Sequence, residues 1–177
     1  MIADSLIPGT KIPLWWPALI PMLLAALFAS IQLDDYAFNR DESDIVYSAG
    51  MYASGPGTLN EVWEFTGRVH PTLTQGWTTL LFVWGRLVGW SEPAIRSLAF
   101  LVALLALAWI YRTGRDLFSP QTALPASLLV SASVLFLAYG ATARAFALAL
   151  MFTAMILWSY GRLMLRSRPT GTGTLAV

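Results

Sequence analysis

The sequence has no cysteine, a single histidine and few charged residues. The absence of cysteine excludes disulfides, thiolate nucleophiles and cysteine-ligated metal ions. A single histidine, His70, excludes a histidine-rich metal site built by this chain alone. Only 12% of the residues are charged, compared with about 25% in a typical soluble domain. With 56% hydrophobic residues and a mean hydropathy of +0.61, this composition is typical of an integral membrane protein.

Several common functional motifs are also absent. The sequence contains no phosphate-binding glycine loop, no zinc-protease helix motif and no nucleophile elbow. It has no basic run interleaved with aromatic residues, so nucleic acid is not expected as a partner. Pro17 and Pro21 interrupt the first apolar run, and no small-residue cleavage site follows it. We therefore interpret this run as a retained membrane anchor and not as a signal peptide.

Five apolar segments make up most of the chain. The first, at about 12–33, is long enough to cross roughly 30 Å of hydrocarbon as a helix. Trp15 and Trp16 lie at its start, where indole side chains favour the membrane interface. The other segments lie at about 72–90, 97–111, 122–139 and 143–161. We predict an all-α integral membrane protein, a multi-span helical bundle that forms a single membrane domain over residues 1–177.

A long polar loop, residues 34–71, follows the first segment. It contains seven of the ten acidic residues and two arginines, which gives a local net charge of −5 in a chain of net charge +1. Its central Ser-Gly-Pro-Gly sequence, 54–57, predicts a turn. Residues 41–53 and 58–68 predict short helices on the membrane surface, with their aromatic side chains at the interface. We expect this outer acidic loop to carry the chemistry.

The arginine positions predict the orientation. The loop 111–121 and the tail after Gly161 carry five arginines, and short arginine-rich loops stay in the cytoplasm. Both regions are cytoplasmic only if residues 72–90, the most polar of the apolar segments, do not cross fully. We therefore predict four crossings of the plasma (inner) membrane, with 72–90 packed over their outer ends. The acidic loop then lies on the periplasmic or extracellular side.

A tag at Ser91 tests this topology. Four crossings place Ser91 on the outer side, so a membrane-impermeant reagent should label the tag in intact cells. Access to the tag from the cytoplasm alone would contradict the predicted topology.

Asp41 and Glu42 form the first candidate site. One carboxylate of such a pair can take a proton from an acceptor hydroxyl, and the other can orient the acceptor or a metal. Alternatively, both are solvated loop acids that enforce the outer topology. Asp34 and Asp35 are a rival pair nearer the membrane, where they could instead cap the first span. The sequence leaves open whether a divalent metal is required.

Four further residues are candidates for substrate and phosphate binding: His70, Glu92, Arg96 and Arg144. Arginine next to an apolar span is costly and usually has a partner or a function. On the outer face, Arg96 and Arg144 could hold a phosphate and stabilise a phosphate leaving group. For Arg96 the alternative is an ion pair with Glu92, four residues earlier. His70 precedes Pro71 at the predicted start of a helix, where it could bind a phosphate oxygen or a metal, or cap the helix.

The order of these motifs resembles the N-terminal part of the membrane-embedded GT-C glycosyltransferases. After the first span come RDESDIVYSA, with its Asp-Glu pair, and HPTL, a His-Pro-x-Leu motif. YRTGRDLF, ALPASLL and AYGATARAFALAL follow. The branch that this order resembles contains bacterial relatives of protein O-mannosyltransferases and aminoarabinose transferases, and the resemblance covers about residues 12–165. Thr72 replaces the second proline of the usual His-Pro-Pro-Leu, and Phe146 replaces the tyrosine of a later Arg-x-Tyr.

The resemblance implies sugar transfer from a polyprenyl-phosphate carrier to an acceptor hydroxyl of a lipid, glycan or protein. The transfer would be inverting and assisted by a general base, Asp41, with Glu42 beside it. His70 would lie at the rim of the site, and Arg96 and Arg144 would lie near the carrier phosphate. Such enzymes have many more spans, so we expect this chain to be the N-terminal portion of a larger module whose activity requires the rest. The alternative is a small non-enzymatic membrane protein that binds a lipid carrier or stabilises a membrane complex.

Overall fold

The computed structural model describes residues 15–32, 38–71 and 73–166, and over these residues the chain is helical without a strand. In chain order the helices are the 3-10 helix η1 Trp16–Ala18, α1 Leu19–Gln32, α2 Arg40–Ser48, α3 Leu59–Val69, α4 Gln75–Val88, α5 Glu92–Leu117, α6 Pro120–Ser131, α7 Val134–Gly140 and α8 Phe146–Arg166. The prediction of an all-α membrane protein is confirmed.

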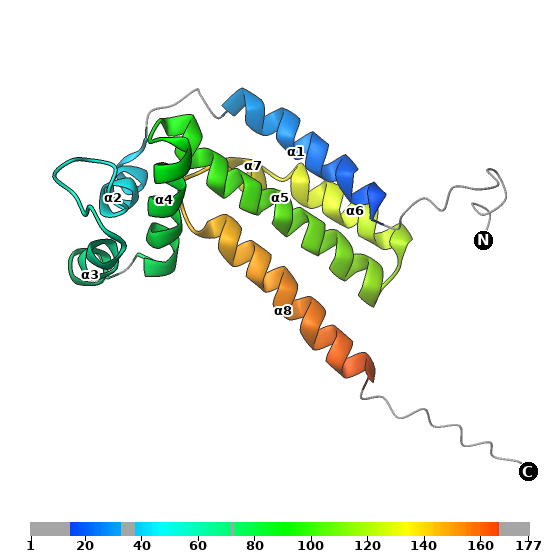
Figure 1. The fold of residues 1–177 in the computed structure, drawn as a ribbon. Helices are drawn as coiled ribbons and strands as arrows, with labels where there is room; N and C mark the ends of the chain where they lie inside the picture. The colour runs from blue at the N-terminus through cyan, green and yellow to red at the C-terminus, as the bar shows by residue number, and fades with distance from the viewer. Residues whose placement is uncertain (1–14, 33–37, 72, 167–177) are drawn as a thin grey trace, which may run out of the picture.

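The helices form a bundle with a cap at one end (Figure 1). The central helix α5 has its most extensive contacts with α8 and α6, and α1 packs against both α5 and α6. The short helices α2, α3 and α4, residues 40–88, lie together beside the start of α5 (Figure 1), and we refer to them as the α2–α4 cap. The opposite end of the bundle carries Arg112, Arg115 and Arg162, and we refer to it as the arginine end.

Two of the described helices, α5 and α8, are long and apolar enough to cross a membrane, and α6 with α7 forms a third if this bent pair is one span. The segment predicted at about 122–139 is not one straight helix, because α6 and α7 are bent by 62°. The break has a local cause: the Ser133 hydroxyl accepts a hydrogen bond from the Phe136 N–H and starts a new helix. The first segment contains a shorter apolar helix, Trp16–Phe28, so its crossing stays a prediction.

Residues 72–90 contain α4, which has 14 residues. At about 1.5 Å per residue this helix is roughly 21 Å long, less than the ~30 Å of a hydrocarbon core. It contacts α2, α3 and α5. This length agrees with the prediction that the segment does not cross fully. Pro71, however, does not open the helix: it lies in a turn, and α4 begins at Gln75.

The predicted short helices of the acidic loop are present as α2 and α3, and each begins with a capping box. The Asn39 side chain accepts the Glu42 N–H, and the Glu42 carboxylate accepts the Asn39 N–H. Thr58 and Glu61 form the same reciprocal pair at the start of α3. These bonds satisfy backbone donors that the first turn of a helix leaves unpaired, which stabilises helices that would be too short to form alone.

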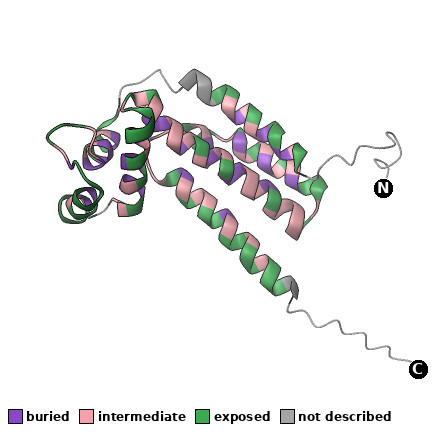
Figure 2. Ribbon diagram, in the orientation of Figure 1, coloured by how far each residue is buried: buried purple, intermediate pink, exposed green. Residues whose placement is uncertain are grey.

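A hydrophobic core joins the α2–α4 cap to the bundle. It contains Ile45, Val46, Ala49, Trp77, Leu81, Ile95, Ala99 and Ala143. A second cluster fills the space between α1, α5, α7 and α8 around Leu107 and Phe136. The surface of α8 is in contrast largely exposed or half-buried along its length (Figure 2), as expected of a helix whose apolar side chains face lipid or further spans.

The variant Gly50→Ala should destabilise the α2–α4 cap. Gly50 has a φ of +89°, and a Cβ atom there would collide with the Pro56 carbonyl oxygen. We expect a loss of about 2 kcal/mol from backbone strain and overpacking, measured as a lower thermal midpoint in detergent. Gly76→Ala is the matched control, because Gly76 lies in α4 and a Cβ there meets no atom within 4 Å. Equal midpoints for the two variants would contradict this turn geometry.

Candidate functional site

Glu42 is the buried centre of the candidate site. Its side chain is in the α2–α4 cap and only 2% exposed. Its Oε2 accepts hydrogen bonds from Arg96 Nη2 at 3.0 Å and from the Asn39 N–H at 3.3 Å. Its Oε1 accepts from the Ala143 N–H at 2.8 Å and from Arg96 Nε at 3.4 Å. A buried carboxylate is tolerated only when it is paired and hydrogen-bonded in this way.

Arg96 lies in the first turns of α5 and is 6% exposed. Its guanidinium carbon also lies 5.2 Å from the ring centroid of Phe38, which is half-buried. Among the described ion pairs, Arg96 pairs with Glu42 and not with Glu92, the partner that sequence spacing offered. Glu92 is the half-buried first residue of α5, where a negative charge is favourable beside the positive end of the helix dipole.

The loop between α7 and α8, residues 141–145, is held at Ala143 from two sides. The Trp77 indole Nε1 donates to the Ala143 carbonyl at 3.0 Å, and the Ala143 N–H donates to Glu42. Trp77 comes from α4 and is almost completely buried. Both backbone polar groups of one residue are therefore fixed by side chains of the α2–α4 cap, and this fixes the position of the next residue, Arg144.

Arg144 meets Asp41 at the surface of the site. Arg144 Nη1 lies 2.9 Å from Asp41 Oδ2, with side-chain exposures of 34% and 62%. The Arg144 guanidinium carbon also lies 4.8 Å from the ring centroid of Phe146. The two adjacent acids thus have different environments: Glu42 faces the interior and is surrounded by donors, whereas Asp41 faces outward with an arginine beside it.

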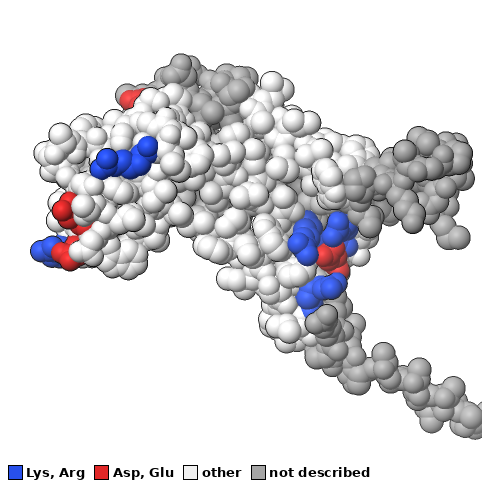
Figure 3. Space-filling model, in the orientation of Figure 1, with Lys and Arg blue, Asp and Glu red and all other residues white. Residues whose placement is uncertain are grey.

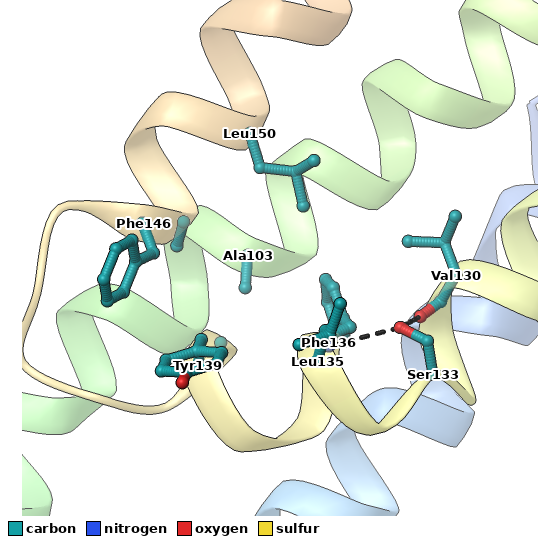
Figure 4. Close-up of a pocket in the computed structure, with 10 residues that line it drawn as sticks. Ala103, Val130, Ser133, Leu135, Phe136, Tyr139, Phe146 and Leu150 are labelled. Atoms are coloured by element: carbon teal, nitrogen blue, oxygen red, sulfur yellow. Dashed lines mark hydrogen bonds between the residues drawn. The ribbon is translucent and has the colours of Figure 1, made fainter.

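Arg144 lines one cavity, and its neighbour Phe146 connects this cavity to a second one. One, of about 290 Å³, is lined by Arg144 and by residues of α2, α4 and α8, among them Ile45, Trp77 and Thr78. The other, of about 450 Å³, is almost entirely apolar and lies between α5, α7 and α8 (Figure 4). Phe146 lines both cavities. A guanidinium group therefore lies over a ring, that of Phe146, which also lines an apolar cavity.

His70 takes no part in this arrangement. It is the half-buried C-terminal cap of α3, where its N–H donates to the Thr66 carbonyl at 3.1 Å. Its ring lies 6.5 Å from that of Phe65. No hydrogen bond or ion pair among the described residues joins His70 to Asp41 or Arg144. The described residues also contain no group of three or more His, Cys, Asp or Glu side chains that could hold a metal ion. Asp34 and Asp35 lie outside the described residues.

The sequence analysis missed three residues that organise the site: Asn39, Trp77 and Ala143. The capping box of Asn39 was detectable, because Asn-x-x-Glu is its signature. The bond from Trp77 to Ala143 spans 66 positions in the sequence, and no local pattern predicts it. The role of Ala143 is carried by its backbone, which the side-chain sequence does not reveal.

The chain matches one family of known proteins. The family model of dolichyl-phosphate-mannose-protein mannosyltransferases matches residues 70–176, more than half of the chain. The chain belongs to this family. No curated protein and no solved structure matches it.

The membership confirms the predicted resemblance to GT-C glycosyltransferases, a family that uses polyprenyl-phosphate-linked sugar donors. The matched residues include Arg96 and Arg144 but begin after Asp41 and Glu42. In the structure, the two ion pairs connect these acids to the matched part of the chain.

Removal of Glu42 should destabilise the protein strongly. Glu42→Ala leaves Arg96 buried without this partner and releases Ala143, so we expect a loss of about 3–5 kcal/mol in the free energy of unfolding in detergent. The matched control is Glu64→Ala in α3, which removes a surface ion pair with Arg68 at 2.7 Å. Its loss should be below about 1 kcal/mol. Similar losses for both variants would contradict the structural role of Glu42.

Proposed function

We propose that this chain forms part of an enzyme that transfers a sugar from a polyprenyl-phosphate carrier to an acceptor hydroxyl at the outer membrane face. The observation that carries this proposal is the ion pair of Asp41 and Arg144, in which Arg144 lines one cavity and its neighbour Phe146 lines both this cavity and a larger apolar one. An exposed carboxylate can serve as a base, and a guanidinium can hold a phosphate.

In the proposed reaction, Asp41 takes the proton of the acceptor hydroxyl as its oxygen attacks the anomeric carbon. The bond from that carbon to the carrier phosphate breaks, and the electron pair leaves with the phosphate. Attack opposite the leaving group inverts the configuration at the anomeric carbon. Arg144 stabilises the negative charge that develops on the phosphate.

The ion pair of Arg144 with Asp41 predicts the order in which the two substrates bind. In the structure the Arg144 guanidinium is paired with Asp41 at 2.9 Å. A carrier phosphate that binds Arg144 bidentately would compete with Asp41 for the same donors. Binding of the polyprenyl-phosphate sugar would therefore release the Asp41 carboxylate for the acceptor hydroxyl. Asp41 would then be available as a base only when there is a sugar to transfer.

The apolar cavity of about 450 Å³ is the proposed place for the first part of the carrier's hydrocarbon chain. Phe146 stacks under Arg144 and also lines this cavity, so it marks the boundary between phosphate and hydrocarbon. A hydroxyl is not needed for this role, which accounts for phenylalanine in place of the tyrosine of the usual Arg-x-Tyr. We assign Glu42 and Arg96 as positioning residues, because Glu42 already accepts four hydrogen bonds, two of them from Arg96.

The proposed orientation rests on the distribution of charge. Basic side chains gather around the far end of α5 and α8, and the acidic side chains Asp41, Asp44, Glu61 and Glu64 belong to the α2–α4 cap (Figure 3). Arginine-rich ends stay in the cytoplasm. This orientation puts the α2–α4 cap on the periplasmic or extracellular side of the plasma membrane, where a lipid, glycan or protein acceptor would meet it.

The variant Asp41→Asn should abolish sugar transfer in the full-length protein without unfolding it, because asparagine keeps the shape of the side chain but is not a base. We expect a loss of at least ~100-fold in kcat, measured with a radiolabelled polyprenyl-phosphate sugar in membranes. The thermal midpoint should change little, since Asp41 is exposed.

Asp44→Asn is the matched control, an exposed acid three residues later on the same helix. Its kcat should stay within about twofold of the wild type. Wild-type turnover in Asp41→Asn would remove Asp41 from the mechanism. A full-length protein that binds the carrier without any transfer would support the alternative of a non-enzymatic carrier-binding protein.

A further inference from the structure

A groove separate from the two cavities near Phe146 lies at the arginine end of the bundle, between α1 and α5. It has a volume of about 560 Å³. Trp15, Trp109, Arg112 and Arg115 line one part of it, and apolar side chains such as Leu19 and Leu105 line another. A groove with two guanidinium groups and two indoles beside hydrocarbon side chains has the polarity of a phospholipid, with a headgroup region and an acyl-chain region.

One cation of this groove, Arg112, is held in place by aromatic rings. The Arg112 guanidinium carbon lies 4.9 Å from the ring centroid of Trp109 and 4.5 Å from that of Trp158. The two rings meet edge to face at 5.6 Å. Cation–π contacts of this kind hold the side chain in one position without neutralising its charge. The Arg112 side chain is 47% exposed and lines the groove.

The local charge is positive. Asp116 is the acid that pairs with this group in the described part of the chain: it lies 2.7 Å from Arg115 and 3.7 Å from Arg112, and it accepts a hydrogen bond from Trp158. Arg162 lies 5.8 Å above the Trp158 ring and adds a third cation. Three arginines against one carboxylate leave a net charge of +2, which is complementary to an anionic headgroup.

We propose that this groove binds an anionic phospholipid of the leaflet that faces the arginine end. The lipid phosphate lies at Arg112 and Arg115, and an acyl chain lies along Leu19 and Leu105. Basic pockets between transmembrane helices at the cytoplasmic side bind anionic headgroups, and indoles favour the same depth of the membrane. The groove has both the arginines and the indoles. It also has an apolar part, at Leu19 and Leu105, which a free phosphate ion would not need.

This site is distinct from the one around Arg144. Arg96 is joined through Glu42 to Ala143, the neighbour of Arg144. Arg112 lies 16 positions after Arg96 on α5, a distance of about 24 Å along the helix axis. The phosphate of one lipid cannot occupy both sites. The inference therefore does not depend on sugar transfer, and an inactive protein would still bind the lipid.

Lipid binding to the purified full-length protein tests the proposal. Native mass spectrometry in detergent would compare added dioleoylphosphatidylglycerol with dioleoylphosphatidylcholine. We expect the wild type to prefer the anionic lipid by at least about fivefold, and Arg112→Gln to weaken its binding by about fivefold, as expected for one arginine near an anionic lipid surface. Arg86→Gln is the matched control, because Arg86 also lies over an aromatic ring, Phe82 at 5.1 Å, but in the α2–α4 cap. It should leave binding unchanged.

Three outcomes would overturn the proposal. They are equal binding of the two lipids, equal losses in Arg112→Gln and Arg86→Gln, and displacement of the anionic lipid by inorganic phosphate alone, which would show a site for a free anion. If Arg112→Gln does not fold, Trp15→Ala takes its place, because the Trp15 side chain is mostly exposed. This variant should weaken binding of the anionic lipid by at least about threefold, and unchanged binding would also overturn the proposal.

Discussion

The buried ion pair between Glu42 and Arg96 is the interaction on which the candidate site depends. It joins a helix of the acidic loop to the central helix of the bundle. The same carboxylate binds the backbone of Ala143, which Trp77 holds from the other side. These contacts bring Arg144 to Asp41, although 103 positions separate the two in the sequence. Burying two charges is costly, and the cost is offset here by four hydrogen bonds to one carboxylate.

Local patterns in the sequence predicted much of the fold and less of the site. Capping residues and apolar length determine where short helices and spans form, and these features were detectable along the chain. The break between α6 and α7 was not predicted, because Ser133 is one of several serines in this segment and only the structure shows which hydroxyl caps a new helix. Asp41, Glu42, Arg96 and Arg144 were all chosen from the sequence as candidate residues. Their pairing was not predicted, because Arg96 had a plausible partner four residues away, and its observed partner lies 54 positions away.

The two proposed lipid sites lie toward opposite ends of α5. Near the start of α5, Arg96 is buried and serves the architecture, while Arg144 pairs with Asp41 at the surface. Near its end, Arg112 is stacked between two indoles and lines a groove. Arginine therefore has at least three physical roles in this chain: a buried structural cation, a surface partner of a carboxylate, and an interfacial cation held by aromatic rings.

The two hydrogen bonds that hold the backbone of Ala143 have a consequence for the order of events during synthesis of the protein. The chain is synthesised from its N-terminus, so the partners of Glu42 emerge in sequence: first Asn39, next Arg96 and, after a further 47 residues, Ala143. Until the ribosome has passed Ala143, one carboxylate oxygen lacks its shortest hydrogen bond and Asp41 has no Arg144 to meet. The α2–α4 cap therefore reaches its final form only after α7 has been made. A nascent chain arrested before that point would hold both acids without the ion pair between Asp41 and Arg144.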